Sequence, residues 1–160
     1  MDYRLAAIAA MFANTDQAFR GALEGVTSSA WLHRAGDLNH LAFLATHLVA
    51  ARHFTLQFAG GTSTDPLEVY HGGARDIEGM NGFPSLGEAL AAWDNVAPIL
   101  HETLAAATRE FLDEDSGLPF PAPGPTRLDA LIFLAQHEAY HLGQMGLLRR
   151  ISGLPATEWR

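Results

Sequence analysis

The feature that most limits the fold is an unbroken apolar segment near the C-terminus, residues 127–151. Thr126, with Asp129 three residues later, is typical of the start of a helix. Nearly every side of the resulting helix is apolar, which predicts an element covered by its neighbours. Gly143 and Gly146 each cost such a helix about 1 kcal/mol relative to alanine, so we expect a neighbouring helix to approach its backbone closely there.

Three further segments have apolar residues at three- and four-residue spacing, which predicts amphipathic helices. The first covers residues 2–24. The second runs for about 22 residues from an N-cap at Asp37 to the Gly60-Gly61 pair, and the third covers 86–113. With no strand pattern and no internal repeat, the sequence predicts an all-α, single-domain four-helix bundle over residues 1–160.

Two local signals refine the third helix. Ser85 and Glu88 form a capping box at its start, and Pro98 inside it predicts a kink. The connection before it, residues 60–84, is long for a compact domain and contains several glycines and prolines. It is either an ordinary crossover or a lid over the bundle whose polar contacts come from Tyr70, His71 or Arg75.

Composition excludes several classes of protein. The chain has no cysteine, so disulfides, thiolate metal ligands and a cysteine nucleophile are ruled out. Its net charge is −8 and all ten basic residues are arginine, without a basic cluster, which argues against nucleic acid as a partner. Because the chain has neither a membrane-spanning apolar run nor a signal-peptide pattern, we expect a soluble cytoplasmic protein.

His137 and His141 lie four residues apart within the C-terminal helix. Side chains at this spacing share one helix face, with Cβ atoms about 5–6 Å apart, so the two imidazoles can converge on one divalent ion. With Glu138 they also spell the His-Glu-x-x-His zinc signature. The alternative is two half-buried histidines that only pack, and a third ligand from another helix would decide between the two.

The second helix offers a candidate for that third ligand. His47 falls near its middle on an apolar stripe, at a depth similar to that of His137 and His141. His40 shares the stripe but lies about 10 Å away along the axis, so it would line a pocket mouth rather than bind the same ion. A second stripe of this helix is polar, and we expect it to face solvent: Asn39, Thr46, His53 and Gln57.

Three polar residues on other helices have more than one interpretation. Thr15 and Asp16 interrupt the apolar stripe of the first helix. They are either tolerated at its edge or face a polar pocket inside the bundle. His101, on the flank of the third helix, is a further candidate metal ligand.

The arrangement of these motifs resembles the DinB/YfiT-like family along the whole chain. The resemblance rests on Trp31, on the inward His47-Leu48 and the helix end at Gly60-Gly61, and on the string from His137 to Gln144, His-Glu-Ala-Tyr-His-Leu-Gly-Gln. It implies one divalent metal ion held by His47, His137 and His141 inside a four-helix bundle. Zinc and nickel are the first candidates, followed by iron and manganese.

Some members of that family join a low-molecular-weight thiol, such as bacillithiol or mycothiol, to an electrophile. Others are thiol-dependent isomerases, and many have no assigned reaction. Three neutral imidazoles leave coordination positions open for water or a thiolate, which is typical of a catalytic site. Because the chain lacks cysteine, the thiol would arrive with the substrate.

Glu138 and Gln144 are the candidate catalytic residues. In zinc proteases the glutamate of this signature is the general base, but a third ligand then follows, and the 19 residues after His141 offer only Glu158 as a carboxylate. Glu138 is therefore read first as a polar group next to the site or between helices, and second as a base. Gln144 lies on the face of His137 and His141, where it would orient a ligand, contact the substrate or simply pack.

The sequence thus predicts a mononuclear metalloprotein that acts on a small molecule, with thiol transfer as the first hypothesis. A hydrolase that uses metal-bound hydroxide is the second hypothesis. A non-catalytic bundle for partner binding is the third. The apolar composition also makes a homodimer plausible.

Overall fold

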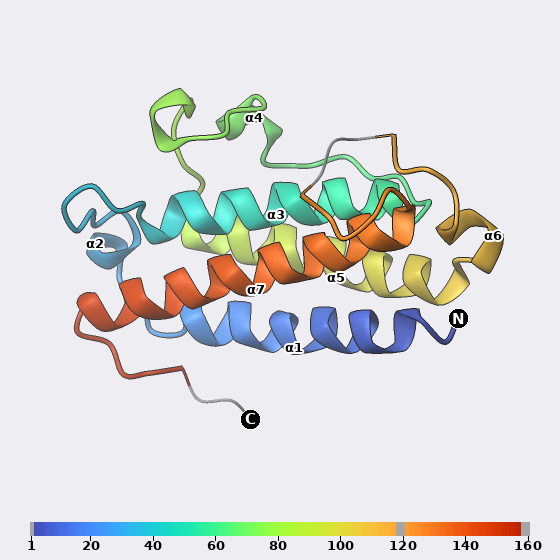
Figure 1. The fold of residues 1–160 in the computed structure, drawn as a ribbon. Coiled ribbons are helices and arrows are strands. Elements are labelled where there is room, and N and C mark those ends of the chain that lie inside the picture. Colours follow the sequence, from blue (N-terminus) through green and yellow to red (C-terminus); the bar gives the residue numbers. More distant parts are fainter. Residues whose placement is uncertain (1, 118–120, 158–160) are drawn as a thin grey trace.

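The computed structural model describes residues 2–117 and 121–157, and it has four long helices (Figure 1). These are α1 (Leu5–Leu23), α3 (Leu41–Phe58), α5 (Leu86–Ala106) and α7 (Arg127–Ile151). Short helical turns lie between them: α2 (Ser28–Trp31), α4 (Glu68–His71), η1 (Ile77–Gly79) and α6 (Arg109–Leu112). No strand occurs in either described range, so the all-α prediction is confirmed.

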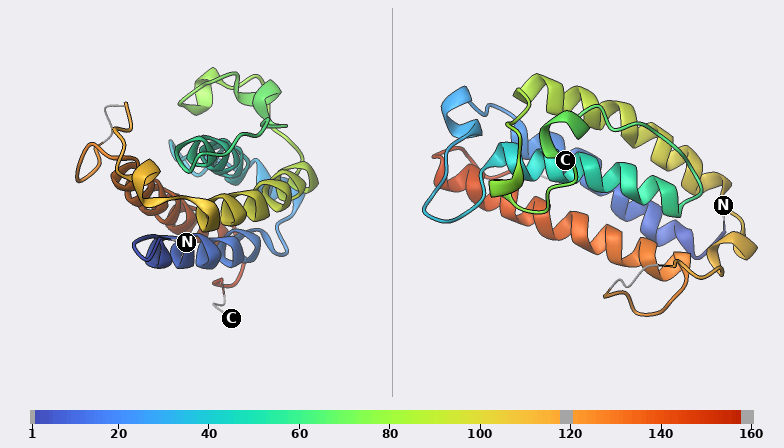
Figure 2. Two further views of the ribbon diagram at one scale, coloured as in Figure 1. Left: turned by 90° about the vertical axis from the view of Figure 1, so that its right-hand side faces the viewer. Right: turned by 90° about the horizontal axis from the view of Figure 1, so that it is seen from above.

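The four long helices form a closed bundle in which each packs against two neighbours. Both α1 and α3 contact α5 on one side and α7 on the other, as the end-on view in Figure 2 shows. The shared core is apolar and falls into two regions along the bundle. One is centred on Phe19, Leu48 and Trp93, the other on Phe12, Leu56 and Leu100, and these side chains are almost fully buried. Burial of this apolar surface drives the packing.

Helix caps mark where the predicted boundaries hold and where they fail. The capping boxes of α5, at Ser85 and Glu88, and of α7, at Thr126 and Asp129, are both present. The predicted cap at Asp37 is wrong, because the ring of His40 takes that role and its Nδ1 accepts from the Phe43 amide at 3.1 Å.

The third predicted helix ends earlier than residue 113. Ala107, the C-cap of α5, has an extended backbone with φ −61° and ψ 131°, which ends α5 at Ala106. Thr108 then caps the separate turn α6 by accepting from the Phe111 amide at 3.3 Å. A threonine side chain that competes for a backbone amide favours such a break over a continuous helix.

The polar stripe of α3 is solvated only in part: Gln57 is exposed as predicted and Asn39 is half-buried, but the two residues between them are buried. Thr46 is fully buried and His53 is only 8% exposed, whereas the apolar Phe54 is 37% exposed. The reason is that α5, α7 and the long connection together cover α3 on most sides. Thr46 is satisfied locally, since it donates to the Ala42 carbonyl at 2.8 Å. His53 is satisfied in part: its Nδ1 lies 2.6 Å from Ser63 Oγ, whereas its buried Nε2 makes no hydrogen bond among the described atoms and lies 3.9 Å from an Asp65 oxygen.

The long connection folds back along α3 and carries α4 and η1 (Figures 1 and 2). Its end is held by the indole of Trp31, which donates to the Pro84 carbonyl at 2.9 Å. Asn81 donates to the Tyr70 carbonyl at 2.7 Å and closes a compact loop. Among the described residues, no helix is long and apolar enough to cross a membrane.

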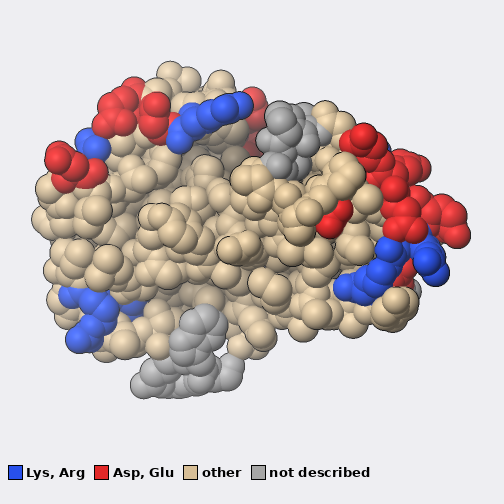
Figure 3. All heavy atoms as spheres, viewed as in Figure 1, with Lys and Arg blue, Asp and Glu red and all other residues tan. Residues whose placement is uncertain are grey.

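The face in front in Figure 1, which α7 forms, is largely uncharged. Figure 3 shows acidic side chains gathered near α6 and around the connection, with few charges between them. Tyr140, Leu147 and Ile151 are exposed on α7 at 65, 56 and 45%. Gly143 and Gly146 line a hollow between α7, α1 and the C-terminal segment, and a Cβ built on either meets none of the described atoms within 4 Å. The expected close approach of a neighbouring helix is therefore wrong.

Replacing Gly146 by alanine should stabilise the protein. The residue is helical and the added methyl group has free space, so only the low helix propensity of glycine is removed. We expect a gain of about 1 kcal/mol, or about 2–4 °C in the midpoint of thermal unfolding, measured by circular dichroism. A lower midpoint would mean that another surface, such as a second copy of the chain, requires the bare backbone.

Candidate metal centre

Three histidine side chains converge between α3 and α7. The Nε2 atom of His137 lies 3.2 Å from that of His47 and 3.1 Å from that of His141. One ring nitrogen of each residue lies within 4.8 Å of the other two. Ligands about 2.0–2.1 Å from a tetrahedral zinc ion are about 3.3 Å apart, so the spacing suits three nitrogens around one ion.

Burial keeps these imidazoles neutral. It lowers the pKa of His47 to about 4, with smaller contributions from the neighbouring rings of His141, His137 and His71. The pKa of His137 also falls to about 4, through burial and then through His141. Burial lowers the pKa of His141 as well, and the hydrogen bond to Gln144 opposes this shift. Neutral rings at physiological pH have free lone pairs, which metal binding requires.

Gln144 selects the tautomer of His141. The Oε1 atom of its side chain lies 2.7 Å from His141 Nδ1, and its amide nitrogen donates to the Tyr140 hydroxyl at 3.2 Å. The oxygen therefore faces the ring and accepts a hydrogen bond from Nδ1–H, which leaves the lone pair on Nε2 free.

The ring of His137 fits an ion better than it fits a hydrogen-bond network. Its Nδ1 is buried and has no hydrogen-bond partner among the described atoms, while its Nε2 faces two other ring nitrogens. Phe43 stacks on His47 with ring centroids 5.9 Å apart, and Phe133 lies 6.0 Å from the His137 ring. A cation at the point of convergence would satisfy the crowded lone pairs within this apolar wall.

Two other predicted histidines lie elsewhere. His101 contacts Asp16 at 2.6 Å and is not part of the convergent set, so the proposal of a further ligand is not supported. His40 is buried at 6% exposure as the cap of α3, with Phe83 at its ring edge, and it does not line a pocket mouth as predicted. Its backbone lies before the helix begins, which turns the ring inward.

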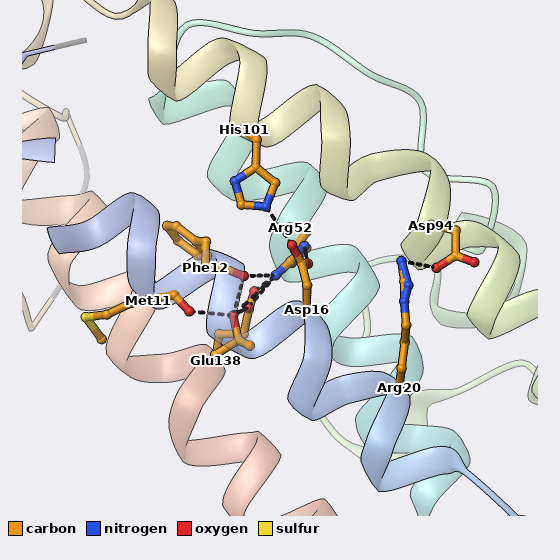
Figure 4. Close-up of polar contacts among 9 residues, drawn as sticks. Met11, Phe12, Asp16, Arg20, Arg52, Asp94, His101 and Glu138 are labelled. Carbon is orange, nitrogen blue, oxygen red and sulfur yellow. Dashed lines mark hydrogen bonds and ion pairs between the residues drawn. The ribbon is translucent and has the colours of Figure 1, made fainter. Parts of the chain in front are cut away.

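Glu138 points from α7 into the bundle, toward Arg52 (Figure 4). Arg52 Nε donates to its Oε2 at 2.9 Å and Arg52 Nη2 to its Oε1 at 2.7 Å, while Thr15 also contacts Oε1. With both oxygens engaged, Glu138 is an interhelical polar group and is not placed as a base. Thr15 and Asp16 belong to the same network, so their interpretation as tolerated edge residues is wrong.

Arg52 is the residue that the sequence analysis missed. It is fully buried and contacts Asp16 and Glu138. The sequence did contain a signal for this role. Arg52 is a single arginine in the apolar second half of its helix, and Asp16 and Glu138 are acidic residues without an evident partner on two other helices. A buried guanidinium requires such partners.

A cavity of about 750 Å³ lies beside the three histidines, and the connection covers it. His47 and His137 line one wall, and Glu68, His71 and Arg75 approach from the connection. The lid interpretation therefore describes the structure better than a plain crossover does, although Tyr70 instead contacts Glu88 at 3.1 Å.

Asp65, Glu68 and His71 also bring ligand atoms within 4.8 Å of one another. Their geometry serves the connection itself, because His71 Nε2 lies 2.9 Å from Asp65 and the Gly73 amide donates to His71 Nδ1 at 3.1 Å. Both nitrogens of His71 are engaged, so the cluster of His47, His137 and His141 is the better-fitting metal site.

Comparison with known proteins adds one finding. The family profile described as the DinB superfamily matches residues 11–145, a range that contains His47, His137 and His141. No curated protein matches the chain.

Metal content tests the site directly. Protein purified without a histidine tag should bind one equivalent of a divalent metal ion, measured by elemental analysis after loading and desalting. His47→Ala or His137→Ala should reduce this to less than a tenth of an equivalent, because two imidazoles hold an ion far less well than three. His33→Ala, which changes an exposed histidine, is the matched control and should retain full loading. Equal loading of all variants would rule out the site.

Proposed function

Because this chain belongs to the DinB superfamily and brings three neutral histidines together, we propose that it is a metal-dependent enzyme that joins a low-molecular-weight thiol to an electrophile. The observation that carries the proposal is the convergence of three neutral imidazoles beside a cavity that His47 and His137 line. His47, His137 and His141 would hold one divalent ion, with zinc or nickel as the first candidates. The ion would lower the pKa of a bound thiol and make its thiolate available at neutral pH.

The reaction is a simple displacement. The sulfur lone pair of the thiolate forms a bond to the electrophilic carbon, and the leaving group departs with the electrons of the broken bond. The thiol proton passes to solvent through the open side of the cavity. No residue of the chain needs to accept it permanently. Glu138 is tied to Arg52 and His71 to Asp65 and Gly73, while Glu68 is an exposed carboxylate that reaches the cavity from the connection.

The orientation of Glu138 makes hydrolysis the weaker candidate function. Hydrolases that activate water commonly place a carboxylate beside the ion to accept a proton. Here the nearest carboxylate in sequence, Glu138, is directed into the bundle and engaged by Arg52. A purely structural role is also disfavoured, because packing alone does not explain three neutral ring nitrogens that meet at one wall of a cavity.

The cavity has two kinds of wall, which suits the two proposed substrates. Ala50, Ala51, Phe54 and Phe133 form an apolar side beside the triad. Glu68 and Arg75 bring charges of both signs from the connection. We assign the apolar side to the electrophile and the charged side to the polar groups of the thiol, with the Arg75 guanidinium facing a carboxylate.

Thiol transfer is tested with metal-loaded protein, a simple alkylating electrophile and bacillithiol, mycothiol or glutathione in separate reactions. Product formation with at least one thiol should exceed the uncatalysed rate by 100-fold or more and should disappear in His137→Ala. Mass spectrometry identifies the thioether. Cleavage of esters or amides without any thiol, together with no thioether, would replace this proposal by the hydrolase.

Arg75→Ala should affect binding of the thiol more than the chemical step. Loss of a charged hydrogen bond at an exposed site should raise KM for a carboxylate-bearing thiol about 5- to 10-fold, with kcat changed less than 2-fold. The matched control is Arg109→Ala on α6, where the arginine is exposed and outside the cavity. An unchanged KM for every thiol tested would remove Arg75 from the proposed binding site.

A further inference from the structure

One buried guanidinium connects all four long helices of the bundle. Arg52, on α3, is 0% exposed and holds Glu138 of α7 through two hydrogen bonds of 2.9 and 2.7 Å. Arg52 also contacts two groups of α1: it pairs with the Asp16 carboxylate, and it donates a hydrogen bond to the Phe12 carbonyl at 3.2 Å. On the side of α5, its Cζ lies 3.6 Å from the centre of the Trp93 ring (Figure 4 shows the polar contacts).

The partners of Arg52 are themselves held in place. Thr15 of α1 contacts Oε1 of Glu138, and its hydroxyl also lies 2.9 Å from the Phe12 carbonyl. His101 of α5 contacts the second oxygen of Asp16 at 2.6 Å. Trp93 stacks on Phe19 of α1 with ring centroids 3.9 Å apart. Side chains from α1, α5 and α7 therefore fix the position and the plane of the guanidinium.

This network is joined to the histidine cluster through the two helices that supply it. Glu138 directly follows His137, and residues one apart on a helix are rotated by about 100°. When Glu138 faces Arg52, His137 is thereby turned toward the cavity, and His141, one turn further along α7, reaches the same point of convergence. On α3, Arg52 follows His47 by five residues, or about 7.5 Å along the axis.

Apolar packing alone does not set this alignment accurately. Hydrophobic contacts between helices are non-directional, and they tolerate a small slide or rotation. A bidentate arginine–carboxylate pair does not, because both hydrogen bonds need one relative position of the two helices. Single buried polar groups set helix register in other bundles in the same way.

We propose that Arg52 and Glu138 are positioning residues for the metal site: their pair sets the register and rotation of α3 against α7, so that His47 meets His137 and His141. The inference rests on the proposed metal binding by these histidines. Glu138 belongs to a His-Glu-x-x-His string, but its proposed role is to position the helices, and for this it must face away from the ion.

The test separates positioning from stability by replacing both partners. Buried ion pairs exchanged for apolar residues of similar size often leave stability unchanged or raise it. We therefore expect Arg52→Met/Glu138→Leu to fold, with an unfolding midpoint near that of the wild type. Its affinity for Co²⁺ should nevertheless fall at least 10-fold, and the visible absorption bands of bound Co²⁺, which report coordination geometry, should shift or weaken.

Single substitutions and a matched control complete the design. Glu138→Gln should also reduce Co²⁺ affinity at least 10-fold. Arg149→Met serves as the control, because Arg149 is a buried arginine of the same helix that donates to the Glu24 and Pro155 carbonyls, 12 residues beyond His137. It should lower stability and leave Co²⁺ affinity and spectrum unchanged. If Glu138→Gln does not fold, Thr15→Val, which removes one contact of the carboxylate, should give a smaller loss of affinity of about 3-fold.

The outcomes also separate this inference from the metal site itself. If the wild type binds no Co²⁺, or if His137→Ala binds it equally well, the metal site is refuted. If the wild type binds and the double variant has the same affinity and the same spectrum, the positioning role is refuted and the metal site stands. Equal losses of affinity in Arg149→Met and in the Arg52 or Glu138 variants would likewise overturn the positioning role.

Discussion

The structure depends on one buried ion pair, Arg52 with Glu138, which joins α3 to α7 in the interior of the bundle by two hydrogen bonds of defined direction. Removing an ion pair from water is costly, and the attraction between its partners offsets that cost only when the remaining hydrogen-bonding groups are also satisfied. Here Thr15, Asp16 and the Phe12 carbonyl take up those groups. Leaving either partner alone in this interior would cost about 3–5 kcal/mol, so the pair allows only one alignment of α3 and α7.

That alignment gives neighbouring residues of α7 opposite roles. His137 lines the cavity and converges with His141 and His47, whereas Glu138 next to it faces the core. A zinc protease uses the same string of residues differently, with the glutamate on the side of the ion. The two uses of the string differ because Glu138 has a partner on another helix, Arg52 of α3. A short motif does not contain that partner and therefore cannot reveal the difference.

Several parts of the fold follow from local patterns, and these were predictable. The capping boxes at Ser85 and Thr126 are satisfied within four residues, and the apolar periodicity of the long helices needs no distant partner. The convergence of His137 and His141 follows from their spacing, whereas His47 was reached through its depth in the bundle and the family resemblance. Other features depend on residues that are distant in the sequence. His53 lies against a connection whose path no pattern specifies, and Arg52 is explained only by partners 36 and 86 residues away.

The charged groups around Arg52 lie apart from the three neutral histidines, and this separation has a chemical consequence. The buried carboxylates of this region, Glu138 and Asp16, are held by Arg52 and do not ligate the ion site. The three imidazoles are neutral, so a divalent ion among them would keep its full charge. A carboxylate ligand would neutralise half of that charge and weaken the attraction for an anionic sulfur. By directing Glu138 toward Arg52, the fold would keep the proposed metal site suited to a thiolate, and in the proposed positioning role the same contact would hold the histidines in place.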